Sequence, residues 1–131
     1  MVKIIIAGSR EFDNYDFLKS NMDVLFNLFE IDKENEQIEI ICGMCRGADT
    51  LGERFAKENG YTIKYFSADW NKYGKAAGVI RNEEMAKYAA EYEDEDDEGI
   101  LVAFWDGKSR GTKNMIDNAE KYGLAQYTVE F

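Results

Sequence analysis

The chain has 131 residues, 45% of them hydrophobic, and a net charge of -10 with no His. This length suits one hydrophobic core, so we expect a single domain over residues 1–131. The acidic balance argues against a protein that wraps nucleic acid, because phosphate backbones attract basic surfaces. Without His, triads built on that side chain are impossible.

The apolar runs and the cysteines bear on where the protein works. The runs are far shorter than a bilayer requires, and the N-terminus begins with a strand pattern where a signal peptide would have a charged region. Cys42 and Cys45 are too few for a disulfide framework. We therefore expect a cytoplasmic protein with no membrane partner.

The first half of the chain alternates between strand and helix patterns. Val2–Ala7 is an apolar run broken only by Lys3, typical of a strand buried on both faces. A helix of roughly 15 residues follows, with Asp13 or Asn14 as its cap. The next predicted elements are a strand over Ile38–Cys42, a helix over Ala48–Asn59 stopped by Gly60, and a strand over Tyr61–Phe66.

The second half continues the alternation. A helical pattern over Ala76–Tyr92 runs into the acidic segment Glu91–Glu98, for which we favour a solvated loop over a metal site because like charges repel. The remaining elements are a strand over Gly99–Trp105, a helix over Thr112–Tyr122 and a strand over Gln126–Val129. Together they predict an α/β protein with a Rossmann-like, three-layer α/β/α fold and a five-stranded, mainly parallel sheet. Its ligands would bind outside the carboxyl ends of the strands.

Cations gather in the loops that would follow the strands, although the protein as a whole is acidic. Seven of the 16 Lys and Arg side chains lie in these loops or at their edges, which favours an anion site there. They are Arg10, Arg46, Lys75, Arg81, Lys108, Arg110 and Lys113.

Glycine-containing loops support the anion site. Ser109–Thr112, with the sequence Ser-Arg-Gly-Thr, opens the last predicted helix, where free backbone amides attract phosphate and glycine allows close approach. The alternative is that Ser109 or Thr112 only caps the helix while Gly107 makes a turn. Gly43-x-x-x-Gly47 has the same form after the second strand, but it lacks the Gly-Lys-Ser/Thr ending of an ATPase P-loop.

Four stretches share their residues and spacing with a known family. They are Gly8-Ser9-Arg10, Gly43-x-x-x-Gly47-Ala48-Asp49, Ala68-Asp69-Trp70 with Gly74-Lys75-x-Ala77-Gly78-x-x-Arg81-Asn82-x-x-Met85, and Trp105-x-Gly107-x-Ser109-x-Gly111-Thr112. They resemble the YspA-like branch of the SLOG superfamily, from about Lys3 to Val129. The resemblance implies a Rossmann-like fold and a nucleotide or nucleotide-derived ligand. The superfamily also includes the LOG phosphoribohydrolases and the DprA DNA-binding proteins.

The resemblance to the LOG enzymes is incomplete at the catalytic positions. Those enzymes pair an arginine, here matched by Arg81, with a glutamate shortly after a Gly-Thr pair. The positions of the glutamate hold Asn114 and Met115. Without that carboxylate nothing obvious stabilises the transition state or activates water, which puts LOG-type hydrolysis in doubt. With Arg81, the catalytic candidates are Asp106, Asp49 and Glu11, each of which can instead orient a ribose hydroxyl or cap a helix.

For a nucleotide ligand, the sequence indicates a set of contacts. The amides of Gly111 and Thr112, with Ser109 and Arg81, would hold one phosphate, and Arg10 with Arg46 a second one, as in ADP-ribose. Gly8 and Ser9 would lie under the ribose, and Asp49 would accept its hydroxyls. The predicted ligand-binding residues are Gly8, Ser9, Arg10, Gly43, Arg46, Gly47, Ala48, Asp49, Trp70, Gly78, Arg81, Asn82, Gly107, Ser109, Gly111 and Thr112.

The tryptophans and cysteines each have two interpretations. Trp70 or Trp105 can stack on a base, but core packing is an equal alternative for Trp70 and is favoured for Trp105. Cys42 and Cys45 have the spacing of a redox pair, yet no helix begins at the first cysteine and a zinc site would need two further ligands. We favour Cys42 as the last residue of a buried strand.

Three functions remain open. The first is a nucleotide-binding module that senses or sequesters a small ligand, and the second is a hydrolase or phosphoribohydrolase acting on a nucleotide derivative. The third, a DprA-like single-strand binder, is disfavoured by the charge and by the lack of a basic, aromatic-lined stripe. We predict no cofactor and no metal. A homo-oligomer formed through Val79–Tyr92 rests on the family resemblance.

Overall fold

The computed structural model describes every residue from Met1 to Phe131. Its strands form one sheet in the order β3-β2-β1-β4-β5, and every neighbouring pair is parallel, which confirms the predicted fold class. The strands are β1 (Val2–Gly8), β2 (Ile38–Cys42), β3 (Thr62–Tyr65), β4 (Glu98–Trp105) and β5 (Ala125–Glu130). The helices are α1 (Tyr15–Leu28), α2 (Ala48–Asn59), α3 (Trp70–Tyr73), α4 (Ala77–Ala89) and α5 (Arg110–Lys121), with a 3-10 helix, η1 (Gly74–Ala76), between α3 and α4.

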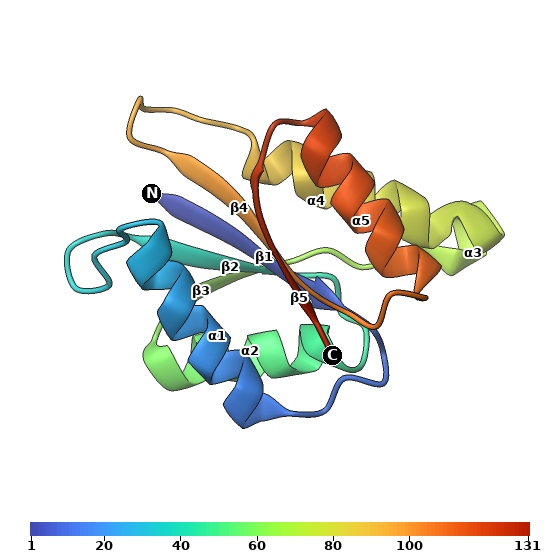
Figure 1. Cartoon of the computed structure of the whole chain (residues 1–131). Coiled ribbons are helices and arrows are strands. Elements are labelled where there is room, and N and C mark those ends of the chain that lie inside the picture. Colours follow the sequence, from blue (N-terminus) through green and yellow to red (C-terminus); the bar gives the residue numbers. More distant parts are fainter.

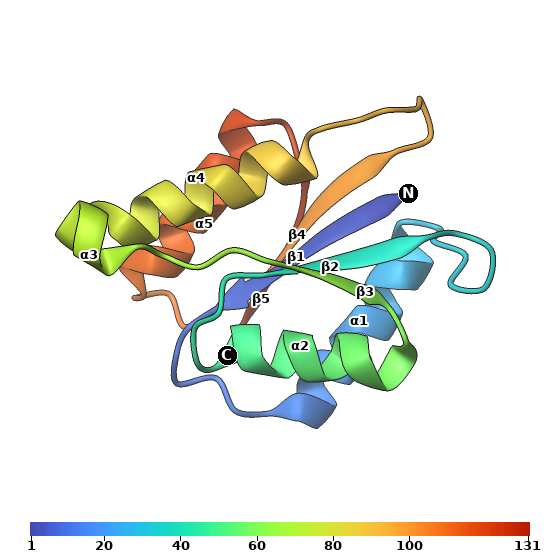
Figure 2. The ribbon, with the colours of Figure 1, turned by 180° about the vertical axis from the view of Figure 1, so that it is seen from behind.

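Two pairs of helices enclose the sheet. Helices α1 and α2 cover one face, and α4 and α5 cover the other, which gives three layers (Figures 1 and 2). Ile4 belongs to the core on the α1 side with Leu18, whereas its neighbour Ile5 belongs to the core on the α4 side with Met85 and Met115. Because successive strand residues point to opposite faces, a continuous apolar strand fills both cores.

Local signals set the ends of the elements near the core. The Asn14 side chain accepts a hydrogen bond from the Phe17 amide at 3.0 Å and begins α1. Gly60, with a φ of 71°, ends α2 as predicted. At Gly8 a Cβ would lie 2.4 Å from the Phe104 carbonyl oxygen, so the end of β1 has room only for glycine. None of the helices combines the length and the apolar character that crossing a membrane demands.

Helix α3 occupies a segment that the sequence indicated as a loop. The Asp69 side chain accepts a hydrogen bond from the Lys72 amide at 3.0 Å and begins the helix. Gly74, with a φ of 55°, ends it after four residues. A helix of this length is too short to show helical periodicity, which explains why the sequence pattern missed it.

Several other boundaries differ from the prediction by one to three residues. Strand β3 is shorter than Tyr61–Phe66 at both ends, and α4 stops at Ala89 rather than at Tyr92. Helix α5 begins at Arg110, two residues before its predicted start, because the Ser109 side chain accepts a hydrogen bond from the amide of the third helical residue, Thr112. Gly111 is therefore inside the first turn of α5.

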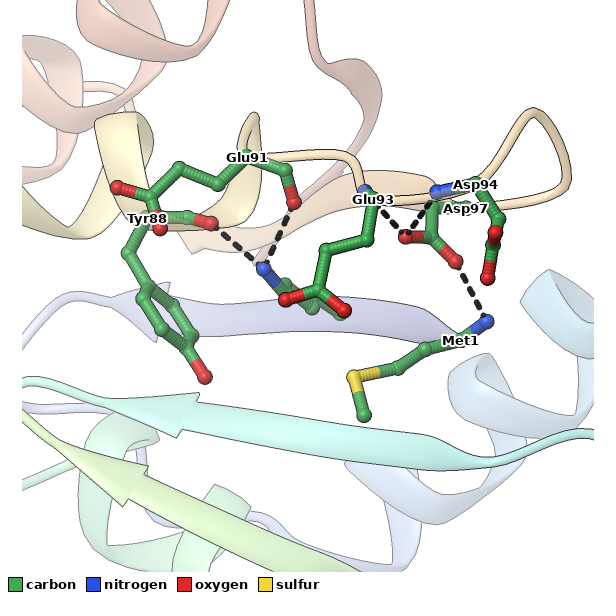
Figure 3. A network of polar contacts seen from close by, with 7 residues as sticks. Met1, Tyr88, Glu91, Glu93, Asp94 and Asp97 are labelled. Atoms are coloured by element: carbon green, nitrogen blue, oxygen red, sulfur yellow. Dashed lines mark hydrogen bonds and ion pairs between the residues drawn. The ribbon is translucent and has the colours of Figure 1, made fainter.

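The acidic segment is a largely exposed connection from α4 to β4, as predicted (Figure 3). Asp97 organises it, since one carboxylate oxygen accepts from the ammonium group of Met1 at 2.9 Å and the other from the Glu93 amide at 2.8 Å. These donors, with the Asp94 amide, lower the pKa of Asp97 to about 2. The network lies where β1 and β4 begin, at the amino ends of the strands. The expected ligand site is at their carboxyl ends.

Candidate functional site

A cleft of about 270 Å³ lies at the carboxyl end of the sheet. It is bounded by the end of β1, the loop between β2 and α2, the start of α4 and the start of α5. Strands β1 and β4 are neighbours at the centre of the sheet, and the strand order runs outward from them in opposite directions. Ligands of open α/β sheets bind at this kind of switch point, which matches the position expected from the sequence.

The start of α5 offers unpaired backbone donors to the cleft. Ser109 Oγ accepts hydrogen bonds from the Thr112 amide at 3.3 Å and from Thr112 Oγ1 at 3.0 Å. The amides of Arg110 and Gly111 donate to no acceptor in the protein. A Cβ on Gly111 would have no atom within 4 Å, so the space above this turn is open. The first turn of α5 therefore has the form of an anion site.

Arg81 links α4 to the loop after β2. Its Nη1 donates to the Gly43 carbonyl oxygen at 2.7 Å and to Cys45 Sγ at 3.0 Å, and its Nη2 donates to Asn82 Oδ1 at 3.1 Å. Its Nε is buried and has no partner. A guanidinium group carries five N–H donors, so Arg81 positions the loop and leaves one Nη2 hydrogen without an acceptor.

A chain of amide side chains joins α4 to α5 beneath the cleft. Asn82 Nδ2 donates to the Gly111 carbonyl oxygen at 3.3 Å and to Asn114 Oδ1 at 3.0 Å. Asn118 Nδ2 also donates to Asn114 Oδ1, at 3.2 Å. Asn114, at a position where the LOG enzymes have a glutamate, is thus used to hold the two helices together.

Asp49 is the carboxylate of the cleft. Its side chain is 6% exposed, and its Oδ2 accepts a hydrogen bond from the Cys45 amide at 3.2 Å. Burial raises the pKa of Asp49 to about 6, against the opposing effects of Arg81, the Cys45 amide and Arg10. The protein has no group of three or more side chains suited to hold a metal ion.

The two other carboxylate candidates lie outside the cleft. Asp106 Oδ1 accepts from the amides of Lys108 and Ser109, both at 2.8 Å, and these bonds lower the pKa of Asp106. Glu11 is exposed and pairs with Arg46 at 3.2 Å. Both carboxylates are therefore engaged elsewhere, and Asp49 is the candidate that the structure brings into the cleft.

The tryptophans and cysteines occupy different environments. Trp70 lines the cleft, is 51% exposed and lies 3.5 Å from where a Cβ of Gly78 would be, so it is not a core residue. Trp105 is half-buried, and its Nε1 donates to the Ser109 carbonyl oxygen at 3.0 Å. Cys42 is buried at the end of β2, as favoured from the sequence, and burial raises its pKa to about 12, whereas Cys45 lines the cleft.

The structure brings together ten of the predicted ligand-binding residues and leaves six outside the cleft lining. Ser9 is buried beside β4, and a Cβ on Gly47, whose φ is 81°, would lie 2.5 Å from the Ser9 carbonyl oxygen, so the two loops are in close contact there. Those in the cleft are Gly8, Arg10, Asp49, Trp70, Gly78, Arg81, Asn82, Ser109, Gly111 and Thr112. Those outside it are Ser9, Gly43, Arg46, Gly47, Ala48 and Gly107.

Eight further lining residues were not predicted. Some had a usable signal, because Met85 is one helical turn after Arg81, and Asn114 and Met115 are one turn after Gly111. Lys75 and Arg110 are among the loop cations that predicted an anion site, although neither was predicted as a ligand contact. The eight are Ala7, Cys45, Lys75, Val79, Met85, Arg110, Asn114 and Met115.

Comparison with known proteins places the chain in a family. The model of the YspA, cpYpsA-related SLOG family matches residues 2–73, from β1 to the end of α3. The chain belongs to this family. Gene 61 protein of Mycobacterium phage D29 is 30% identical over 129 residues, which cover 95% of this chain and 93% of the phage protein. No solved structure matches.

Membership of the SLOG family points to nucleotide-related binding or processing. The matched segment holds the β1 and β2 loops of the cleft, with Gly8, Arg10, Asp49 and Trp70. The starts of α4 and α5 lie beyond it, although the similarity to the phage protein extends over nearly the whole chain. One wall of the cleft is thus the family segment, and the other is supplied by the second half of this SLOG protein.

Proposed function

We propose that residues 1–131 act as one nucleotide-binding domain that senses or sequesters a nucleotide or nucleotide-derived ligand in the cleft. The observation that carries the proposal is the first turn of α5, where the amides of Arg110 and Gly111 lack acceptors and both residues line the cleft. Amides at the positive end of a helix dipole bind phosphate. The nucleotide part of the proposal is supported by the family.

The charges around the cleft favour the same ligand. Four of its lining residues are cations, in a protein whose net charge is -10. They are Arg10, Lys75, Arg81 and Arg110. The exposed ring of Trp70 at the edge of the cleft offers a stacking surface for a base. The volume, about 270 Å³, is close to the lower end of small-ligand sites, roughly 300 to 1,000 Å³, which suits a mononucleotide portion.

Thermal denaturation with a panel of nucleoside mono- and diphosphates, cyclic nucleotides and ADP-ribose tests the proposal. A ligand that binds the folded protein raises its stability by mass action, roughly 2.7 kcal/mol at about 100 times the Kd. Gly111→Asp should abolish this gain without unfolding the protein, because the new carboxylate enters open space and repels phosphate. Val24→Asp, which adds the same charge to the exposed side of α1, is the control and should leave the gain unchanged. Failure of every ligand in the panel to stabilise the protein would exclude this function.

A hydrolase acting on the same class of ligand is the second candidate. The observation that favours it is Asp49, a buried carboxylate in the cleft whose pKa is raised to about 6, close to that of an effective general acid or base. Chromatography of each stabilising ligand after incubation separates the two candidates. Intact ligand supports sensing or sequestration, and release of a free base or of phosphate supports hydrolysis.

A further inference from the structure

The cleft contains one acidic side chain among four cations. Asp49 lies at the start of α2, and the other two acidic candidates, Glu11 and Asp106, are outside the cleft. A carboxylate near a phosphate site opposes the binding of an anion, because like charges repel, and the repulsion is strong where water is excluded. The position of Asp49 therefore constrains which anions the cleft can accept.

Half of the Asp49 carboxylate has no partner in the protein. Oδ2 accepts from the Cys45 amide, whereas no group donates to Oδ1. The carboxylate forms no ion pair, even with Arg81 close by. Because Oδ1 is unpaired and is still not counted as a buried unpaired atom, it keeps some contact with solvent. A side chain that is 6% exposed thus turns an unpaired acceptor toward the cleft.

Gly43 provides the space in which this carboxylate lies. A Cβ on Gly43 would be 2.9 Å from Asp49 Oδ2 and 3.2 Å from Arg81 Cζ. The absence of a side chain there lets both charged groups approach the loop backbone. Arg81 nevertheless uses Nη1 for the Gly43 carbonyl oxygen and Cys45 Sγ, and none of its N–H groups donates to Asp49 Oδ1.

We propose that Asp49 is the specificity-determining residue of the cleft, and that it selects phosphorylated ligands whose sugar hydroxyl donates a hydrogen bond to Oδ1. This inference rests on the proposed nucleotide binding and names the feature of the nucleotide that is recognised. A neutral hydroxyl suits Oδ1 better than an ammonium donor, because the four cations of the cleft would repel a positively charged group. A phosphate ligand without such a donor is repelled by the Asp49 carboxylate and forms no hydrogen bond that offsets the repulsion.

The test compares matched ligands by isothermal titration calorimetry. The probes are the four ribonucleoside 5′-monophosphates, their 2′,3′-dideoxy counterparts and methyl phosphate. We expect the best-bound ribonucleotide to bind about 10- to 100-fold more tightly than its dideoxy counterpart, as for loss of one hydrogen bond to a charged group. This comparison uses the unaltered protein, so it does not depend on the folding of a variant.

The variant Asp49→Asn adds a second criterion. It should weaken binding of the ribonucleotide and at the same time strengthen binding of methyl phosphate, because the repulsive charge is gone. A purely structural role for Asp49 would weaken both. Glu34→Gln removes an exposed acidic side chain from the connection between α1 and β2, outside the cleft, and should change neither affinity.

The outcomes separate this inference from the proposed function. Binding of ribonucleotides without preference over the dideoxy forms, or equal weakening of both probes by Asp49→Asn, would overturn the role of Asp49 and leave nucleotide binding intact. Absence of binding by every nucleotide would overturn both. A ribonucleotide preference with opposite effects of Asp49→Asn on the two probes would establish the inference.

Discussion

Arg81 both lines the cleft and holds the loop after β2 in place. Its guanidinium group holds the Gly43 carbonyl oxygen, Cys45 Sγ and Asn82 Oδ1, which fixes the loop after β2 against α4. Its buried Nε has no acceptor, a costly state for a charged donor.

The two cysteines are expected to differ sharply in reactivity. Cys42 is 1% exposed and burial raises its pKa to about 12, whereas Cys45 lines the cleft and accepts a hydrogen bond from Arg81. Thiolates, not thiols, attack disulfide reagents. We predict that the native protein reacts with one equivalent of a disulfide reagent, at Cys45, and that a bound nucleotide slows the reaction at least several-fold by occupying the cleft.

Mass spectrometry of the labelled protein identifies the reacting residue. Cys45→Ser should remove the fast reaction, and unfolding in denaturant should expose both thiols. Labelling of Cys42 in the native protein, or a rate at Cys45 that no bound nucleotide changes, would contradict the geometry described above.

Among the elements, α5 begins at a capping residue, Ser109, that also lines the cleft. Ser109→Ala removes the oxygen that accepts from the Thr112 amide and should lower the free energy of unfolding by about 0.5 to 2 kcal/mol. Asn14→Ala removes the corresponding cap of α1 and should cost about as much. Urea denaturation measures both losses.

Binding distinguishes these two caps. Ser109→Ala should also weaken nucleotide binding, because fraying of the first turn misplaces the amides of Arg110 and Gly111. Asn14→Ala should leave the affinity unchanged, since α1 lies on the opposite face of the sheet. If both variants lost affinity equally, the first turn of α5 would have no special part in the site.

Most elements could be predicted because their signals are local. The alternation of apolar runs and helical periodicity identifies all five strands and the four longer helices, and Gly60 marks the end of α2. Helix α3 was not predicted because its four residues carry no periodic pattern. Its start and end depend on Asp69 and Gly74. The predicted start of α5 was two residues too late, because both Ser109 and Thr112 are possible caps in the sequence.

The site was predictable at its loops and less so along its helices. Glycine and cation placement pointed to the ends of β1 and β2 and to the start of α5, and ten of the residues named from the sequence line the cleft. Sequence alone could not show that the Asp106 carboxylate is used by its own turn, or that Ser9 is buried. Such outcomes depend on contacts between loops that are distant in the chain.

At the scale of the molecule, the charged groups differ between the amino ends and the carboxyl ends of the strands. The acidic segment Glu91–Glu98 lies where β1 and β4 begin, whereas Arg10, Lys75, Arg81 and Arg110 lie at their carboxyl ends. A cleft lined mainly by one sign of charge, here four cations and one carboxylate, focuses the field and raises the local concentration of oppositely charged ligands. The overall acidity therefore does not prevent the cleft from attracting anions.

Asp49 also makes the stability of the whole protein depend on pH in a predictable direction. Its pKa rises from 3.8 to about 6 on folding, so the folded state binds the proton more tightly. The stability that protonation contributes is fully present below pH 3.8 and is lost as pH rises through 6. We predict that the free energy of unfolding of the native protein, relative to Asp49→Asn, falls by up to about 3 kcal/mol between pH 4 and 7.

Asp97→Asn provides a control of opposite sign. The pKa of Asp97 falls to about 2 on folding, so its contribution is present above 3.8 and disappears as pH falls toward 2. Urea denaturation across pH measures both variants. A difference between the native protein and Asp49→Asn that stays constant from pH 4 to 7 would mean that Asp49 is not buried as described.

The unequal environments of the tryptophans give the protein an intrinsic optical reporter. Trp70 is half exposed at the rim of the cleft, whereas the indole of Trp105 is tied by its Nε1 to the chain that leads into α5. A ligand that covers Trp70 would change the solvent around this indole, whereas Trp105 is outside the cleft lining. Emission of the unlabelled protein would therefore report the proposed occupancy of the cleft in real time, without an attached dye.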